Sequence, residues 1–219
     1  MTLKLKKMTI FLFTILLVVM MILFSLYIGN ILNRTLAYIL TFCVYWFVFC
    51  IPISLYYLDG IVEIKSVYIC STKLSTLQSA FIMLAFMPCI ATFCVVFINI
   101  LSVAPVQVFL IAVLFAIING VVEELFWRGI FISLFPKNIM LGYILPTFLF
   151  GLWHIALFLS KGIVYQGNFI TLIGGSMCMG FLWGFIAYKS KVIKIVTIAH
   201  VVTNFFAFSG LIYENWFML

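Results

Sequence analysis

The chain has 219 residues, of which 67% are hydrophobic and only 8% are charged. Soluble domains contain about 45–50% apolar and about 25% charged residues, so this composition excludes an ordinary soluble domain and predicts an integral membrane protein. The formal net charge is +7, but the basic residues stand singly or in small groups at the ends of apolar segments. That pattern is typical of membrane topology and argues against nucleic acid as a partner.

The first apolar segment follows three lysines and resembles a secretory signal. The run from Met8 to Ile28 is longer than the roughly 7–15 residues of a signal-peptide core, and no small-x-small cleavage site follows it. We therefore predict that it is a retained transmembrane helix.

Further apolar segments follow along the chain, and crossing a bilayer takes about 20 residues per helix. The predicted spans are 8–29, 35–58, 78–99, 106–135, 139–160, 168–188 and 194–213. The sequence leaves open whether the fourth span ends before Arg128 or continues to Pro136. We predict an all-α bundle with no separate soluble domain, in which residues 1–104 form three spans and residues 105–219 form four.

The basic residues are unevenly shared between the two sides of these spans. One side has ten of them: Lys4, Lys6, Lys7, Lys65, Lys73, Arg128, Lys137, Lys189, Lys191 and Lys194. The other side has only Arg34 and Lys161. The positive-inside rule then places the N-terminus in the cytoplasm and the C-terminus, with Glu214, outside.

The sixth predicted span carries a stripe of small residues. Ser176, Gly180 and Gly184 recur at every fourth position, so they share one helix face. Small side chains on one face allow a second helix to approach closely, and we expect helix packing at this stripe.

Two adjacent glutamates are the most informative polar residues. Glu123 and Glu124 follow a stretch from Leu74 to Val122 that contains no charged residue. Placing one carboxylate at membrane depth costs about 2.5–3.5 kcal/mol on insertion scales, and like charges resist ionising together. The remaining strong polar groups of the later spans are Arg128, the only two histidines, His154 and His200, and Asn204. These residues indicate a function inside the bilayer.

Helix geometry separates the roles of the two glutamates. Glu124 and Arg128 are four residues apart, which predicts an ion pair, whereas Glu123 is rotated by about 100° and is expected to be the freer carboxylate. A free carboxylate with one histidine can activate water, and a second histidine with the amide of Asn204 can stabilise an oxyanion. Each residue also has a structural interpretation: packing histidines, an asparagine between helices, and an ion pair without catalytic function.

Three short motifs in these spans resemble a known family. Glu123-Glu124-Leu125-Phe126-Trp127-Arg128 fits the EExxxR motif of the CPBP intramembrane proteases, the CAAX-protease and bacteriocin-processing (Abi) family. Phe150-x-x-x-His154 and His200-x-x-x-Asn204 fit its second and third motifs, in the expected order. The resemblance covers residues 105–212, and the first three spans carry no part of it.

The resemblance implies a four-helix core around a cavity that opens toward the cytoplasm. It implies that Glu123 activates water together with His154, that His200 and Asn204 stabilise the oxyanion, and that Glu124 with Arg128 supports the site. The expected enzyme is an endopeptidase of a bacterial cytoplasmic membrane that cleaves a membrane-anchored, lipidated or amphipathic peptide near the cytosolic side. Prenylated proteins, peptide pheromones and bacteriocins are all compatible substrates.

Metal dependence and non-catalytic functions remain as alternatives. Members of the family are often described as metalloproteases, and a zinc site of Glu123, His154 and His200 is chemically allowable. Such a site would occupy the base and one oxyanion donor, so we expect catalysis without a metal or other cofactor. The rival functions are a non-catalytic immunity or scaffold protein and, with less support, a proton-coupled transporter.

Overall fold

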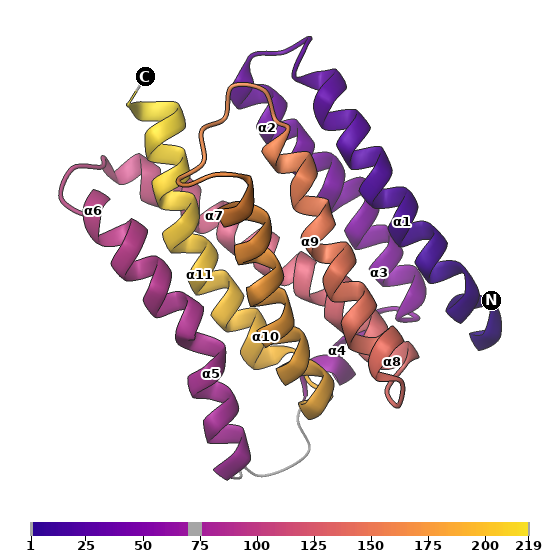
Figure 1. Ribbon diagram of the computed structural model, residues 1–219. Helices are drawn as coiled ribbons and strands as arrows, with labels where there is room; N and C mark the ends of the chain where they lie inside the picture. Colours follow the sequence, from indigo (N-terminus) through magenta and orange to yellow (C-terminus); the bar gives the residue numbers. More distant parts are fainter. Residues whose placement is uncertain (1, 70–75, 219) are drawn as a thin grey trace.

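The computed structural model describes residues 2–69 and 76–218. Seven helices in this described part are long and apolar enough to cross a membrane, and they lie side by side as one bundle (Figure 1). The all-α, polytopic architecture predicted from the sequence is therefore confirmed. A membrane favours a helical bundle because the backbone N–H and C=O groups of each helix pair with one another inside that helix.

The first three spans come from the N-terminal half. They consist of α1 (Leu3–Ile28), then α2 (Arg34–Cys43) with the π-helical turn η1 (Val44–Cys50) and α3 (Ile51–Tyr57), then α5 (Thr76–Thr92) with η2 (Phe93–Phe97) and α6 (Ile98–Ile100). A short helix that was not predicted, α4 (Ile61–Tyr68), follows the second span. The turn before it contains Asp59 and Gly60 with φ of 51° and 91°, a conformation that glycine adopts without strain.

The last four spans form the other half of the bundle. They consist of α7 (Val106–Glu124) with η3 (Leu125–Ile130) and α8 (Phe131–Leu134), then η4 (Met140–Ile144) with α9 (Leu145–Phe158), then η5 (Ile170–Gly174) with α10 (Gly175–Ser190), then α11 (Lys194–Ile212) with η6 (Tyr213–Phe217). The fourth span therefore continues past Arg128 to Leu134.

Two predicted boundaries are displaced outward. Helix α1 begins at Leu3 instead of position 8, because the side chain of Thr2 caps it by accepting a hydrogen bond from the Leu5 amide. Lys6, on the added turn, is buried and pairs with Asp59. The last span continues to Phe217 instead of ending at 213. Helical turns that carry polar residues thus extend beyond the apolar segments that the sequence marks.

The small-residue stripe of α10 packs against α9, as predicted. A Cβ atom added at Gly180 would lie 3.0 Å from Cδ1 of Phe150, and one added at Gly184 would lie 2.9 Å from Oγ1 of Thr147. Side chains larger than hydrogen at these positions would push the two helices apart. The stripe therefore sets the distance between α9, which carries His154, and α10, whose backbone lies near Arg128.

Helices α7 and α11 make a second close approach at Gly120. A Cβ atom at this position would lie 2.7 Å from Cγ2 and 3.0 Å from the backbone nitrogen of Val201. Gly120 precedes Glu123 by three residues, and Val201 follows His200 directly. The contact therefore holds the glutamate pair of α7 against the histidine of α11.

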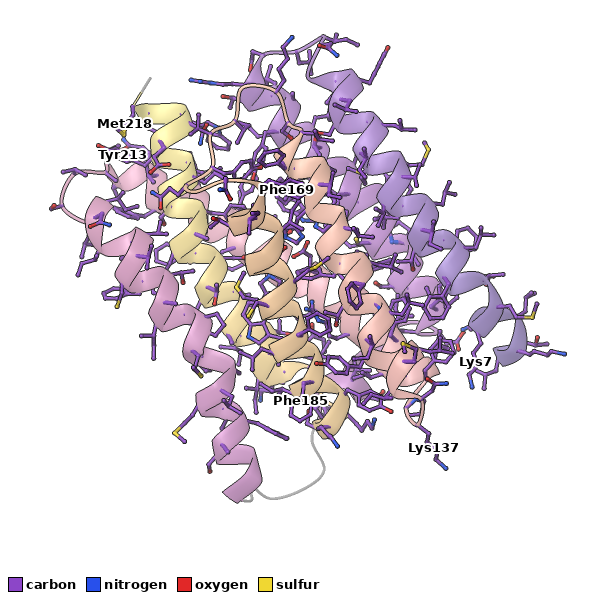
Figure 2. The ribbon with its side chains drawn as sticks, in the orientation of Figure 1. Lys7, Lys137, Phe169, Phe185, Tyr213 and Met218 are labelled. Carbon is purple, nitrogen blue, oxygen red and sulfur yellow. The ribbon has the colours of Figure 1, made fainter. Side chains whose placement is uncertain are left out.

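The basic residues gather at one end of the bundle. Lys7 and Lys137 lie at the end opposite Tyr213 and Met218 (Figure 2). Of the ten basic residues predicted for this side, Lys73 lies outside the described residues and Arg128 is buried inside the bundle. The other eight mark the lysine-rich end, whereas Arg34 and Lys161 belong to the opposite end. This is the end that the positive-inside rule predicts to be cytoplasmic.

Candidate active site

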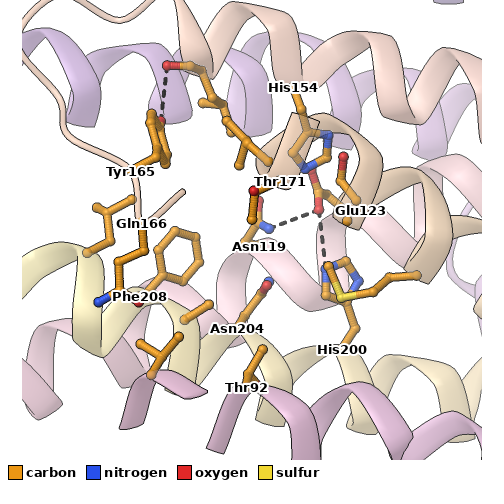
Figure 3. A pocket seen from close by; sticks show the side chains of 18 of the residues that line it. Thr92, Asn119, Glu123, His154, Tyr165, Gln166, Thr171, His200, Asn204 and Phe208 are labelled. Carbon is orange, nitrogen blue, oxygen red and sulfur yellow. Dashed lines mark hydrogen bonds and ion pairs between the residues drawn. The ribbon is translucent and has the colours of Figure 1, made fainter. Parts of the chain in front are cut away.

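The tertiary structure brings all six predicted residues into one region. Glu123 and Glu124 end α7, Arg128 lies in η3, His154 lies in α9, and His200 and Asn204 lie in α11. A cavity of about 260 Å³ is lined by four of them, Glu123, His154, His200 and Asn204, which come from three different helices (Figure 3). Glu124 and Arg128 lie behind its wall.

Glu124 and Arg128 form the predicted ion pair. An Nη1 atom of Arg128 lies 3.0 Å from Oε1 of Glu124, and both side chains are buried. The guanidinium also donates to the carbonyl of Gly180 at 3.4 Å, and its Cζ atom lies 4.4 Å from the ring centroid of Phe150. The guanidinium thus connects α7 with α9 and α10.

His200 lies between the two glutamates. Its Nδ1 atom is 2.8 Å from Oε1 of Glu124, and its Nε2 atom is 3.5 Å from Oε2 of Glu123. The imidazole also stacks on Trp183 with 4.5 Å between ring centroids. The contact with Glu124 was not predicted, because the sequence pairs Glu124 only with Arg128. It orients the ring so that Nε2 points to the cavity.

The expectation that Glu123 is the freer carboxylate is wrong. Its Oε1 atom accepts hydrogen bonds from the Tyr45 hydroxyl and from Nε1 of Trp153, both at 2.9 Å. Its Oε2 atom accepts one from Nδ2 of Asn119 at 2.9 Å. The prediction from helix geometry took into account only partners on the same helix, whereas two of these donors come from other spans. A charge-assisted hydrogen bond of this kind stabilises a buried carboxylate.

These donors are themselves held by aromatic residues. Trp127 donates to the Tyr45 hydroxyl at 2.7 Å, and Trp46 donates to Oδ1 of Asn119 at 2.8 Å. The ring of Tyr45 stacks on Trp153 with centroids 3.7 Å apart. Sequence reasoning missed this network. Only Asn119 carried a detectable signal, because it precedes Glu123 by four residues and shares its helix face.

His154 presents one defined nitrogen to the cavity. Its Nδ1 atom lies 2.9 Å from the carbonyl oxygen of Phe150. A carbonyl oxygen can only accept, so Nδ1 carries the proton, and Nε2 of the neutral ring is left as an acceptor. The backbone of its own helix therefore sets the tautomer of this histidine.

Asn204 has a free donor at the cavity wall. Its Nδ2 atom is buried and has no hydrogen-bond partner among the described residues, although the residue lines the cavity. A buried amide without a partner costs about 1–3 kcal/mol. Groups of this kind are retained where a ligand supplies the missing acceptor.

The cavity extends from these residues toward the C-terminal end of the bundle. One face of α11 and its last turn lines it at Asn204, Ala207, Phe208, Leu211 and Glu214. Tyr165 and Gln166 lie at the end of the cavity away from Glu123 and His200 (Figure 3). The cavity thus extends away from the lysine-rich end of the bundle.

The polar groups at this far end are fixed by hydrogen bonds. The hydroxyl of Tyr165 donates to the Leu157 carbonyl at 3.0 Å, and Gln166 donates to the carboxylate of Glu214. Burial, and then the neighbouring phenol of Tyr38, raises the pKa of Tyr165. The phenol of Tyr165 is therefore a neutral donor at physiological pH.

The proposed zinc ligands do not form a compact metal site. Within the described residues, no three His, Cys, Asp or Glu side chains are grouped closely enough to hold a metal ion. Both Nδ1 atoms are directed away from the cavity, so the two Nε2 atoms and Glu123 remain the only inward-facing members of the set. The arrangement gives a carboxylate flanked by donors instead of a closed coordination shell.

The comparisons with known proteins identify a family. Residues 105–206 match the family model described as type II CAAX prenyl endopeptidase Rce1-like. This segment contains all six predicted site residues and ends two residues after Asn204. Neither a curated protein nor a solved structure matches the chain significantly.

Proposed function

We propose that this chain, whose residues 105–206 match the Rce1-like CAAX prenyl endopeptidase model, hydrolyses a peptide bond inside the bilayer. The observation that carries the proposal is the single cavity shared by Glu123, His154, His200 and Asn204. Hydrolysis requires water at membrane depth, and a cavity with polar side chains in its wall can hold water there without exposing backbone to lipid. The substrate is a membrane-associated peptide, and both lipidated and amphipathic peptides fit this class.

Glu123 is the proposed general base. The donors on Oε1 fix the plane of the carboxylate, so Oε2 can accept a proton from a water molecule in the cavity. The Nε2 lone pair of His154 provides a second acceptor for that water. The resulting hydroxide attacks the carbonyl carbon of the substrate, and the proton passes to the nitrogen that leaves as the amine.

Asn204 and His200 are the proposed oxyanion stabilisers. The unpartnered Nδ2 of Asn204 is available to the oxygen that becomes negative in the tetrahedral intermediate. His200 can contribute in the same way when Nε2 also carries a proton. Two carboxylates, one guanidinium and one imidazolium then sum to zero charge, which limits the cost of burying the set. Donors in a low-dielectric site contribute strongly to such stabilisation.

Exchanging the carboxylate of Glu123 tests this mechanism. Glu123→Gln keeps the shape of the side chain but removes the base, so cleavage should fall by about 10²–10⁴-fold. The assay is cleavage of a fluorogenic library of amphipathic and lipidated peptides by purified full-length protein in lipid vesicles.

Glu124→Gln is the matched variant on the neighbouring residue. It leaves Arg128 without its buried counter-charge, a loss of about 3–5 kcal/mol for a buried pair. Expression and thermal stability should therefore fall together with activity, whereas Glu123→Gln should remain folded. Wild-type cleavage by Glu123→Gln would show that Glu123 is not the base.

We further propose that the reaction needs no metal. A zinc ion bound by Glu123, His154 and His200 would remove the base and one oxyanion donor, while Glu124 stays paired with Arg128. Purified active protein should lack stoichiometric metal in elemental analysis and should keep its activity in a chelator. Stoichiometric zinc whose removal reversibly abolishes cleavage would contradict this part of the proposal.

A further inference from the structure

We propose that Trp46 and Trp127 are positioning residues for the candidate base Glu123. Each indole N–H fixes the orientation of one polar neighbour of the carboxylate, so that both carboxylate oxygens face hydrogen-bond donors. This role rests on the proposed peptidase function, in which Glu123 activates water. It extends the reaction machinery to the second span, because Trp46 lies in η1 and the family match begins only at residue 105.

The first indole orients a hydroxyl group. Trp127 donates from Nε1 to the hydroxyl oxygen of Tyr45 at 2.7 Å, and that hydroxyl donates to Oε1 of Glu123 at 2.9 Å. An indole N–H can only donate, whereas a phenolic hydroxyl can donate or accept. Because Trp127 makes the hydroxyl oxygen an acceptor, the hydroxyl proton is left for Glu123.

The second indole orients an amide group. Trp46 donates from Nε1 to Oδ1 of Asn119 at 2.8 Å, and Asn119 donates from Nδ2 to Oε2 of Glu123 at 2.9 Å (Figure 3). A carboxamide has an acceptor at one end and a donor at the other. Turned by half a rotation, its oxygen would face the carboxylate and its NH₂ group would face the indole N–H. Trp46 therefore favours the one orientation in which the amide stabilises Glu123.

The two oxygens of Glu123 are left with different capacities. Oε1 accepts from the Tyr45 hydroxyl and from Nε1 of Trp153, both at 2.9 Å, which uses both of its lone-pair sites. Oε2 accepts one hydrogen bond, from Asn119, and retains a lone pair. The hydrogen bonds thus assign Oε2 as the oxygen that takes the proton from water.

Aromatic packing holds the two indoles in place. The ring centroid of Trp46 lies 4.9 Å from that of Phe42 and 5.4 Å from that of Phe115. Trp127 packs edge-on against Phe150 with 5.8 Å between centroids. Both indoles are at most 3% exposed, and buried polar groups in native structures keep their partners. Each N–H is therefore directed at one acceptor.

Replacing each indole with a benzene ring tests this role. Trp46→Phe and Trp127→Phe keep an aromatic side chain and remove the N–H. In the full-length protein in lipid vesicles, with the best-cleaved peptide of the fluorogenic library, kcat should fall by about 10–100-fold, since a misplaced group can cost about 10²-fold. KM should stay constant because neither indole is assigned a contact with the peptide.

Trp216→Phe is the matched control. Nε1 of Trp216 is buried and has no hydrogen-bond partner among the described residues. Its ring packs on Phe115 with 5.9 Å between centroids, as the ring of Trp46 does. The same exchange therefore removes an N–H that orients nothing, and Trp216→Phe should keep the wild-type kcat.

Double variants separate positioning from packing. Trp127→Phe should cause no further loss of kcat in a Tyr45→Phe background, and Trp46→Phe none in an Asn119→Leu background, because each indole acts through that neighbour. A packing role would give the same fold-loss in both backgrounds. Additive losses therefore overturn the inference, and so does wild-type kcat in Trp46→Phe and Trp127→Phe.

Tyr45→Phe and Asn119→Leu also serve where an indole variant does not fold. They remove the oriented donors and leave the indoles intact, so kcat should again fall at constant KM, and wild-type kcat in both overturns the inference. Glu123→Gln separates the two proposals. If it is inactive while the indole variants keep the wild-type kcat, the positioning role fails and the peptidase mechanism stands. If Glu123→Gln retains cleavage, the mechanism fails, and the positioning role fails with it.

Discussion

Glu123 and Glu124 are adjacent in the chain, yet their carboxylates meet different neighbours. Glu124 contacts Arg128 and His200, whereas Glu123 is held by neutral donors from Tyr45, Trp153 and Asn119. The 100° between successive helical residues separates the two side chains. Only one of them then reaches the cavity, so two identical residues acquire different chemistry.

At Asn204 we predict a loss of activity without a loss of stability. Asn204→Leu keeps a similar volume and removes a buried donor that has no partner, so the melting temperature should stay constant or rise. Cleavage should fall by about 10²–10³-fold, the usual effect of removing one oxyanion donor. Thermal unfolding in detergent and peptide cleavage in vesicles measure the two effects.

The neighbouring Thr203 provides the control for Asn204. Its hydroxyl is buried and lies 3.1 Å from the sulfur of Cys89, away from the described site contacts. Thr203→Val should leave cleavage unchanged. If Asn204→Leu were destabilised but fully active, the asparagine would be a packing residue and not an oxyanion donor.

At the scale of the helix, the spans depart from regular α geometry near the site. The π-helical turn η1 carries Tyr45 and Trp46, and η3 carries Trp127 and Arg128. Wider turns of this kind are frequent at functional sites. A regular period of 3.6 residues, on which the sequence-based predictions rest, does not direct these side chains toward Glu123.

At Gly120 we predict a coupled loss of stability and activity. In Gly120→Ala the new Cβ atom would overlap Val201, so α7 and α11 must separate at a cost of about 1–3 kcal/mol. The separation would lengthen the contact between Glu123 and His200. Thermal unfolding and cleavage assays should show both effects.

Two further variants separate this contact from a general effect of alanine. Gly174→Ala introduces the same methyl group where the nearest side-chain atom, Cγ2 of Ile170, is 3.9 Å away, and it should be neutral or slightly stabilising. In Gly120→Ala with Val201→Ala the overlapping side-chain methyl is removed, so part of the activity should return. A fully active Gly120→Ala would mean that the helix spacing does not govern the site.

At the scale of the whole molecule, the N-terminal spans contribute directly to the site. Tyr45 and Trp46 belong to the second span and donate to Glu123 and Asn119, although the family match begins only at residue 105. Residues from both halves also share one buried core. The division into residues 1–104 and 105–219 therefore describes where the family resemblance lies, while the carboxylate environment spans both parts.

The position of the cavity and the distribution of lysines distinguish the two ends of the bundle. The lysines mark one end, the cavity extends toward the other end, and the candidate catalytic residues lie between them. A lone sequence can count charges in loops, but it cannot show toward which end of a bundle a cavity extends. That property depends on side chains such as Trp183, which contact several helices at once.

The sequence by itself determined the features that depend on composition and local spacing. Apolar length determined the seven spans, the four-residue spacing determined the Glu124–Arg128 pair, and small residues on one face determined that the sixth span packs closely against a neighbouring helix. Three motifs on three spans pointed to the six candidate site residues and to the family whose model residues 105–206 match. All of these are properties of one helix at a time.

Only the tertiary structure decided which groups from different helices meet. It surrounded Glu123 with donors from three spans, set His200 between two glutamates, left the Asn204 amide unpartnered, and extended the cavity away from the lysine-rich end. The physical reason is that these contacts depend on helix rotation, tilt and separation. Packing at Gly120, Gly180 and Gly184 sets those quantities, and no spacing along the chain encodes them.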